Sequence, residues 1–339
     1  MVNSPQHASL NCPWRRAPER GIPRLSHLDA PADGVESAAA FSHAPVDDAL
    51  LAQHLQGLAL DRELVMETTS TNADLVSRAR AGAPARPVLR VARRQTQGRG
   101  RQGRRWHGSE DGSLLFSLAV PWQRDPAGSS AVTLACGLAV AASLQEQLDP
   151  VGARIRVKWP NDILLNEGKL AGILVEMAED PSGARTLVIG VGINLVADAG
   201  LLARVAQDRP GAQGAADAAA AAVAVADLAS ILGAAAVLAE REAWLARLVR
   251  ALLAAAQRFG REGFAGGPAA FAACCAYDGL AVDVHGAGGP PTTGVQRGVD
   301  AQGRLLLETQ GVLQAVNSGE LSVRRSTTAG PPGHAGAAP

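Results

Sequence analysis

Hydrophobic and polar residues follow a regular pattern only in the middle of this 339-residue chain. Residues 1–44 mix Pro, Ala, Ser, His and Arg without a sustained period, and residues 326–339 are similar, so both ends are predicted to be disordered. Between them the pattern predicts a larger α+β domain at 45–272, followed by a small β domain at 273–325.

Helical periodicity predicts helices at 47–58, 129–150 and 227–259. The second of these is apolar on nearly every side, which is typical of a buried helix. A further helix is expected at 70–82, where a Ser-Thr-Asn sequence can cap the first turn and a glycine can end the last. Residues 198–226 are rich in Ala, Gly and Asp, lack a clear period, and are expected to form a loop.

Strands are predicted where short apolar runs or alternating positions lie between turn residues. The runs before residue 150 are 61–69, 87–92 and 112–122, and a second group of strands lies between 154 and 195. Short turns join the second group, so these strands are expected to be antiparallel neighbours. The fold class is therefore α+β, with a mixed, largely antiparallel sheet flanked by helices and a small barrel-like β unit after it.

Composition excludes several classes of function. Lys+Arg and Asp+Glu are equal at 32 each, so no basic surplus supports a broad nucleic-acid surface. No uncharged run is long and apolar enough to predict a membrane span, and the first thirty residues lack the apolar core of a secretory signal. The four cysteines have neither C-x-x-C spacing nor a histidine cluster, which argues against zinc and disulfides and fits the cytoplasm. The arginine-rich start leaves an organelle transit peptide open.

The stretch GRGRQGRRWHG at 98–108 holds four arginines, four glycines and no acid. It fits G-x-G-x-x-G, but a dinucleotide site needs a helix directly after the loop, and the following residues have no helical period. A solvated basic loop and a nucleic-acid patch are two alternatives. The third is a flexible loop that closes over one small ligand with a phosphate group.

Four segments together resemble the biotin protein ligases, which attach biotin to the carrier domains of carboxylases. They are TSTN at 69–72, RRQTQGRGRQGRRW at 93–106, KWPNDILLNEGKLAGILVE at 158–176 and GVGIN at 190–194. The resemblance extends over roughly 45–325, because GVDAQGRLLLE and SGELSVR resemble the family's C-terminal domain. It implies a catalytic domain similar to class II synthetases and an SH3-like domain after it.

The resemblance also implies a reaction. Members of the family activate biotin with ATP, giving biotinyl-5′-AMP and pyrophosphate, and a lysine of a biotin carboxyl carrier protein or domain then attacks the mixed anhydride. The substrates are therefore expected to be biotin and ATP, with Mg²⁺ as cofactor. An enzyme for this step must mainly position anions and neutralise their charge, which suits arginine and lysine. The basic loop is then expected to be a lid over the adenylate.

The same resemblance implies roles for individual residues. The expected biotin contacts are Ser70, Thr71, Asn72, Gln95, Arg99, Gly100, Arg101 and Lys169. The expected ATP and adenylate contacts are Arg99, Arg101, Lys158, Asn161, Asp162, Lys169 and Asn194. Lys169 and Arg101 are the expected catalytic residues. Asp162 is expected either to contact the ureido group or to bind Mg²⁺, and both roles stay open. The alternatives to these ligand roles are structural ones: residues 70–72 only cap a helix, Lys169 is only a turn residue, and Lys158 is only a surface residue of a strand.

Three further features are expected on the same basis. Trp106 is either a core residue or a wall beside the adenine, and Gly190 and Gly192 allow a ligand to approach the sheet closely. A lipoate–protein ligase shares the expected fold, but GRGRQGRRW favours biotin. Residues 1–44 lack the pattern of a recognition helix, which favours a ligase without a DNA-binding domain over a biotin-responsive repressor. No DNA or membrane partner is expected, and a homodimer is left open.

Overall fold

A computed structural model of the chain describes residues 45–124, 129–208, 224–286, 290–318 and 321–326. At its centre is a seven-stranded sheet of order β1-β2-β3-β7-β6-β5-β4. The strands are β1 Asp61–Thr68, β2 Val88–Gln95, β3 Ser113–Trp122, β4 Ile155–Lys158, β5 Asp162–Leu165, β6 Gly168–Glu179 and β7 Arg185–Asn194. β1 and β2 are parallel, whereas the other neighbouring pairs are antiparallel, which confirms the predicted mixed sheet.

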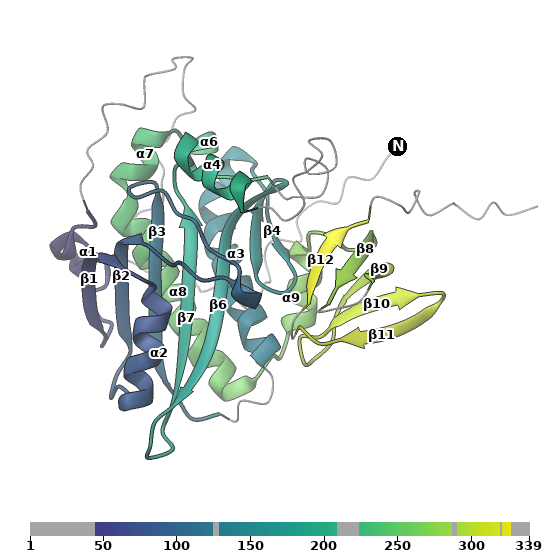
Figure 1. Cartoon of the computed structure of the whole chain (residues 1–339), viewed down its shortest axis with the longest axis horizontal. Helices are drawn as coiled ribbons and strands as arrows, with labels where there is room; N and C mark the ends of the chain where they lie inside the picture. The colour runs from purple at the N-terminus through teal and green to yellow at the C-terminus, as the bar shows by residue number, and fades with distance from the viewer. Residues whose placement is uncertain (1–44, 125–128, 209–223, 287–289, 319–320, 327–339) are drawn as a thin grey trace, which may run out of the picture.

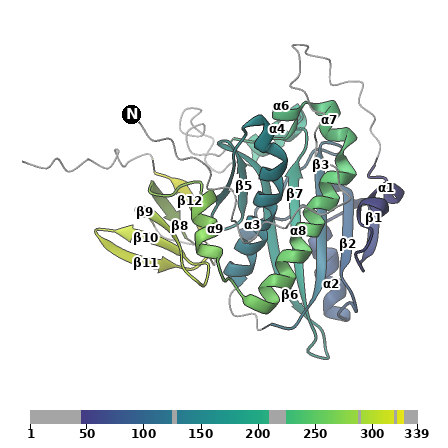
Figure 2. The ribbon, with the colours of Figure 1, turned by 180° about the vertical axis from the view of Figure 1, so that it is seen from behind.

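Helices cover both faces of this sheet. α2 (Thr71–Ala81) lies on one face in Figure 1, and α3 (Ser129–Leu148) and α8 (Arg241–Glu262) lie together on the other, as Figure 2 shows from behind. α1 (Asp48–His54) packs on α8. The predicted buried helix is confirmed, because α3 is largely buried between the sheet and α8.

Within the described residues, one helix is long and apolar enough to cross a membrane, and it is this same segment, Ala131–Val151. About two thirds of it (67%) is buried inside the protein. A core helix of a soluble protein has these properties, and the packing against α8 and β6 is that of a core helix.

The region after β7 differs from its prediction. Residues 198–226 were expected to form a loop, but α4 (Ala199–Gln207) lies there, while residues 209–223 are outside the described range. Asp198 caps α4 by accepting a hydrogen bond from the Leu201 amide at 2.6 Å, and the Leu201 side chain is buried. The prediction of a loop was wrong because one buried leucine and one cap suffice for a short helix packed on a large domain.

The predicted helical region at 227–259 is confirmed but is divided. It contains α6 (Ala229–Leu232), α7 (Ala234–Ala239) and most of α8, with Gly233 between the first two. Gly233 has a φ of +81°, where a side chain would strain the backbone. α9 (Gly267–Cys274) follows and leads to the second domain.

The C-terminal part is a five-stranded antiparallel sheet of order β11-β10-β9-β8-β12, as predicted for a small β domain. Its strands are β8 Ala281–His285, β9 Thr292–Val299, β10 Leu305–Thr309, β11 Val312–Val316 and β12 Ser322–Arg325. It lies beside the β4 edge of the large sheet (Figure 1). The Trp159 indole donates to the Gly303 carbonyl at 3.0 Å, and the Ala276 amide donates to the Val157 carbonyl. The predicted disordered segments were 1–44 and 326–339, and apart from Ser326 they lie outside the described residues.

Candidate active site

A single cleft brings together nearly all the residues singled out in the sequence. Its walls come from the start of α2, the end of β2, the loop 98–106, the middle of the large sheet and β12 of the small domain. The predicted residues that line it are Ser70, Thr71, Asn72, Gln95, Arg99, Gly100, Arg101, Lys158, Asn161, Asp162 and Lys169. Asn194 does not line it.

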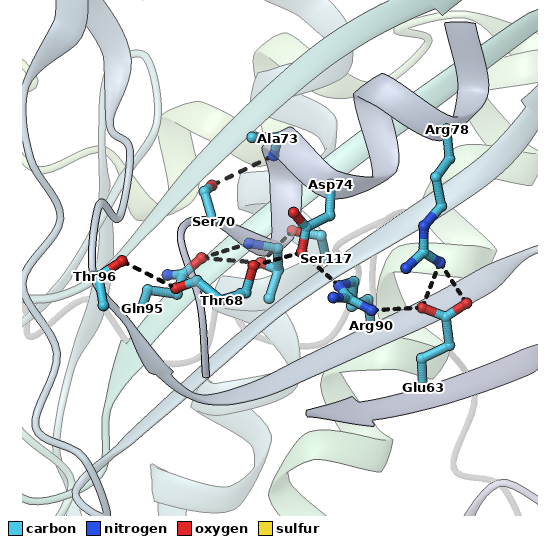
Figure 3. Close-up of polar contacts among 11 residues, drawn as sticks. Glu63, Thr68, Ser70, Ala73, Asp74, Arg78, Arg90, Gln95, Thr96 and Ser117 are labelled. Carbon is cyan, nitrogen blue, oxygen red and sulfur yellow. Dashed lines mark hydrogen bonds and ion pairs between the residues drawn. The ribbon is translucent and has the colours of Figure 1, made fainter. Parts of the chain in front are cut away.

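One side of the cleft is formed by Ser70, Thr71 and Asn72, which we call the Ser-Thr-Asn wall. All three are at most 3% exposed. Ser70 does cap α2, since its hydroxyl accepts from the Ala73 amide, so the helix-cap interpretation holds alongside any ligand role (Figure 3). The Thr71 amide donates to Gln95 Oε1 at 2.8 Å, and the Thr71 and Ser117 hydroxyls are 2.8 Å apart. The wall is therefore held by hydrogen bonds to β2 and β3.

An ion-pair network joins this wall to β1 and β2 (Figure 3). Asp74, in the first turn of α2, accepts from Thr68 Oγ1 at 2.6 Å and from Arg90 Nε at 2.7 Å. Arg90 also donates to Glu63 at 2.8 Å, and Arg78 binds the same carboxylate. Burial raises the pKa of Glu63, but the hydrogen bonds from Arg78 and Arg90 outweigh it and leave the pKa below its usual value. Sequence analysis missed this network, although acids and arginines at matching positions of β1, β2 and α2 were its signal.

Two lysines and one aspartate form the floor near β5. Asp162 Oδ1 lies 2.7 Å from Lys169 Nζ, and Asp162 Oδ2 lies 3.5 Å from Lys158 Nζ. Burial raises the pKa of Asp162, but the two ammonium groups outweigh it, so the pKa is lowered and the carboxylate stays charged. Burial lowers the pKa of Lys158 more than Asp162 raises it. With both lysines protonated the cluster carries one net positive charge, which suits an anionic ligand.

Trp106 lies over two glycines of the sheet. A Cβ at Gly172 would be 3.0 Å from its ring, and one at Gly192, the residue paired with Gly172, would collide with it. Lys169 Nζ is 5.3 Å from the ring centroid, in reach of a cation–π contact. Gly190 makes room for Asn72 in the same way. These glycines therefore accommodate side chains of the site itself, and Trp106 is a wall of the cleft rather than a core residue.

A further part of the cleft lining comes from the segment 98–106, which we call the arginine loop. The Trp106 amide donates to the Gly98 carbonyl at 2.9 Å, and the Gly100 amide donates to the Arg104 carbonyl at 2.7 Å. The Arg101 guanidinium donates to the Ser318 carbonyl of the small domain. Burial lowers the pKa of Arg101, with nearby Asp162 opposing it, yet arginine remains charged at neutral pH. Sequence analysis missed the contact with the small domain.

Asn194 supports Lys169 from behind the cleft. Its Nδ2 donates to the Ala226 carbonyl at 3.1 Å and to the Lys169 carbonyl at 3.5 Å. The Lys169 amide donates to the Ala224 carbonyl at 2.6 Å, and the Ala226 amide returns a bond to Lys169. The backbone of Lys169 is thus held on both sides. The role predicted for Asn194 toward ATP stays a prediction.

Asp162 does not suit a Mg²⁺ site by itself. Both of its oxygens face lysines, and the described residues contain no group of three or more His, Cys, Asp or Glu that could hold a metal. Mg²⁺ is usually held by one or two carboxylates together with substrate phosphates. The Mg²⁺ role left open for Asp162 therefore stays a prediction.

Comparison with known proteins identifies the family to which the chain belongs. Residues 65–194 match the biotin/lipoate A/B protein ligase family, and residues 281–324 match the biotin protein ligase C terminal domain. The chain is 32% identical over 281 residues to a biotin–[acetyl-CoA-carboxylase] ligase of Mycobacterium tuberculosis, covering 82% of this chain and 95% of the relative. The chain belongs to the biotin protein ligase family.

Two further relatives are consistent with this family assignment. The bifunctional ligase/repressor BirA of Escherichia coli is 33% identical over 236 residues, which is 69% of this chain and 65% of that protein. A biotin protein ligase from Aquifex aeolicus, solved in complex with biotin and ATP, has 26% identity and a TM-score of 0.60, covering 78% of this chain and 99% of that one.

Proposed function

We propose that this protein is a biotin–[acetyl-CoA-carboxylase] ligase. It forms biotinyl-5′-AMP from biotin and ATP, with pyrophosphate as the leaving group, and then transfers the biotinyl group to a lysine of a biotin carboxyl carrier protein or domain. One observation carries the proposal: within the cleft of a biotin protein ligase fold, the Lys158, Asp162 and Lys169 cluster and Arg101 lie with the Ser-Thr-Asn wall.

In the first step a carboxylate approaches the α-phosphate of ATP, and the repulsion between these anions is the main obstacle. Lys169 offers a positive charge at a fixed position between them, because its ammonium is held by Asp162 and its backbone by residues 224–226. Arg101 adds a second cation from the arginine loop. Lys158 lies deeper and supports the phosphates. We assign the adenylation step mainly to the two lysines, and retention of the adenylate to Arg101.

In the second step the amine of the carrier lysine attacks the carbonyl carbon of biotinyl-5′-AMP. An amide bond forms, the attacking nitrogen gives up one proton to the solvent, and AMP leaves with the electrons of the broken anhydride bond. The adenylate must stay bound until the carrier arrives, which we assign to the arginine loop. The carrier domain is accordingly the protein partner, and biotin and ATP are the small substrates.

Mg²⁺ is proposed to enter as part of the ATP complex, since both oxygens of Asp162 face lysines. The catalytic domain is proposed to comprise 45–272 and the SH3-like domain 273–325, with the last turn of α9 joining them. The proposed location is the cytoplasm, because ATP and carboxylase carriers are found there. We propose no DNA-binding activity, which the equal numbers of acidic and basic residues support.

The test is substrate-dependent ATP–pyrophosphate exchange, followed by transfer to a carrier domain. The protein is incubated with ATP, Mg²⁺ and either biotin or lipoate. Exchange that depends on biotin, and label on one carrier lysine, is the expected result. Exchange that occurs with lipoate but not with biotin would show that the chain is a lipoate ligase. Exchange with neither acid would reject the proposed activity. A sequence-selective gel shift at high salt would reject the proposal about DNA.

A further inference from the structure

The amide of Asn72 has one partnered end and one unpartnered end. The residue is 3% exposed, and its Nδ2 donates to the carboxylate of Glu176 on β6. Its Oδ1 is buried and has no hydrogen-bond partner among the described residues. Buried polar atoms in native proteins nearly always have partners, so an exception in a binding cleft indicates a place that a ligand fills.

Glu176 determines which end of the amide faces the cleft. An ionised carboxylate can only accept, so the Asn72 Nδ2 group must be the end that faces it. Oδ1 then points the other way, toward Gly190, where a Cβ would lie 2.6 Å from it. Asn72 and Gly190 both line the cleft, whereas Glu176 is outside its lining. The cleft therefore receives an acceptor from Asn72.

Gln95 is held with the opposite polarity. Its Oε1 accepts from the Thr71 amide at 2.8 Å and from the Thr71 hydroxyl at 3.2 Å. The Nε2 group of Gln95 is left as a donor. A ligand that suits both side chains must offer an N–H to Asn72 and an oxygen to Gln95, as a cyclic urea does.

We propose that Glu176 is a specificity-determining positioning residue. By fixing the polarity of Asn72, it makes the cleft select a ligand with a ring N–H and reject one that has only an acceptor or an apolar group there. This inference rests on the proposed function, since the ureido ring of biotin has two N–H groups and the dithiolane of lipoate has none. Glu176 acts through Asn72 and does not itself contact the ligand.

A merely structural role would give a different result. If Glu176 only connects β6 to α2, its loss weakens the binding of every ligand to the same extent. If it sets polarity, its replacement by glutamine changes the preference between ligands, because glutamine can donate as well as accept and lets the Asn72 amide reverse. The informative quantity is therefore a ratio of two substrates, and not a single rate.

The experiment compares wild type, Glu176→Gln and Glu176→Ala in ATP–pyrophosphate exchange. The matched control is Glu179→Gln, on the same strand, where Glu179 is exposed and pairs with Arg185 at 2.9 Å. The substrates are biotin and its two analogues in which a ring oxygen replaces one or the other ureido N–H. Melting temperatures establish that each variant is folded, and kcat/KM is measured for each substrate, with KM for ATP alongside.

Wild type and Glu179→Gln should prefer biotin over one of the two analogues by about tenfold or more, because a hydrogen bond is replaced by two facing acceptors. In Glu176→Gln and Glu176→Ala that ratio should fall at least about threefold, while KM for ATP stays within about twofold. An unchanged ratio in the folded variants would overturn the proposal. Failure of the proposed function is distinguishable, because wild type would then show no biotin-dependent exchange.

Discussion

The Ser-Thr-Asn wall and the arginine loop face the same cleft but are held in different ways. The wall is buried, and its bonds run to Gln95 and Ser117 in the adjoining strands. Arg99, Arg104 and Arg105 of the loop are exposed, and Arg101 bonds to Ser318, 217 residues away in the chain. A prebuilt wall is suited to recognising one ligand, whereas a weakly held loop can open and close.

This contrast predicts that different variants will affect biotin binding and adenylate formation on the one hand, and retention of the adenylate on the other. Changes in the floor or wall should reduce adenylate formation or biotin binding, and changes in the loop should release an adenylate that still forms. The following variants are ordered from the largest expected effect to the smallest.

Lys169→Ala should have the largest effect, because it removes the cation between Asp162 and Trp106. Loss of one group that stabilises transition-state charge costs roughly 100- to 1,000-fold in rate. Biotin-dependent ATP–pyrophosphate exchange measures it, with Arg185→Ala, a half-buried arginine that does not line the cleft, as the control. Exchange within about threefold of wild type in a folded variant would show that Lys169 is only a turn residue.

Arg101→Gly should leave the adenylate able to form but unable to stay. One charge-assisted bond is worth roughly 1.5–3 kcal/mol, so escape should be about ten- to a hundredfold faster. In a mixture with serum albumin, biotin, ATP and Mg²⁺ but no carrier, albumin should gain biotin much faster than with wild type. If albumin labelling stays at the wild-type rate while exchange persists, the loop does not retain the intermediate.

Arg90→Ala should weaken the attachment of α2, which carries the Ser-Thr-Asn wall, to β1 and β2, because Asp74 and Glu63 lose the arginine that binds both. Breaking a largely buried ion pair costs about 3–5 kcal/mol, and the partial exposure of both acids reduces this to about 2 kcal/mol. Urea unfolding measures the loss, and KM for biotin should rise. The matched control is Arg94→Ala on the same strand, an exposed pair with Glu67 that should cost less than about 1 kcal/mol. Equal losses in both variants would contradict the network.

Lys158→Arg should change the response to pH more than the rate at neutral pH. Burial lowers the pKa of Lys158, so its ammonium loses the proton at a lower pH than a free lysine, and exchange should decline as pH rises toward that point. Arginine stays charged, so the alkaline decline should move upward, with about a threefold advantage over wild type at high pH. Superimposable pH profiles would show that the charge of Lys158 is not needed.

Removal of residues 1–43 should have the smallest effect. Their composition cannot bury a core, and the cleft is lined by residues 70–323. A chain that begins at Ala44 should biotinylate a carrier domain within about twofold of the full-length rate. A large loss of activity with an unchanged melting temperature would assign those residues a role in the reaction.

Local signals account for the features that the sequence predicted. The Ser-Thr-Asn cap of α2 and the turn before Lys169 depend on neighbours a few residues away, and the motif around each identified the cleft. Contacts between distant segments could not be predicted in this way. The bond from Arg101 to Ser318, and the seat of Trp106 over Gly172 and Gly192, arise only when the sheet and the small domain have assembled.

Retention of the adenylate tests the central claim most directly. Labelled biotin and ATP are mixed with wild type, Arg101→Gly or Asn72→Ala, the protein is separated rapidly from free ligand, and bound adenylate is followed over time. The account predicts long retention in wild type, normal formation with fast loss in Arg101→Gly, and poor formation in Asn72→Ala. Equal retention in wild type and Arg101→Gly, or full formation in Asn72→Ala, would contradict the division between a wall that recognises and a loop that retains.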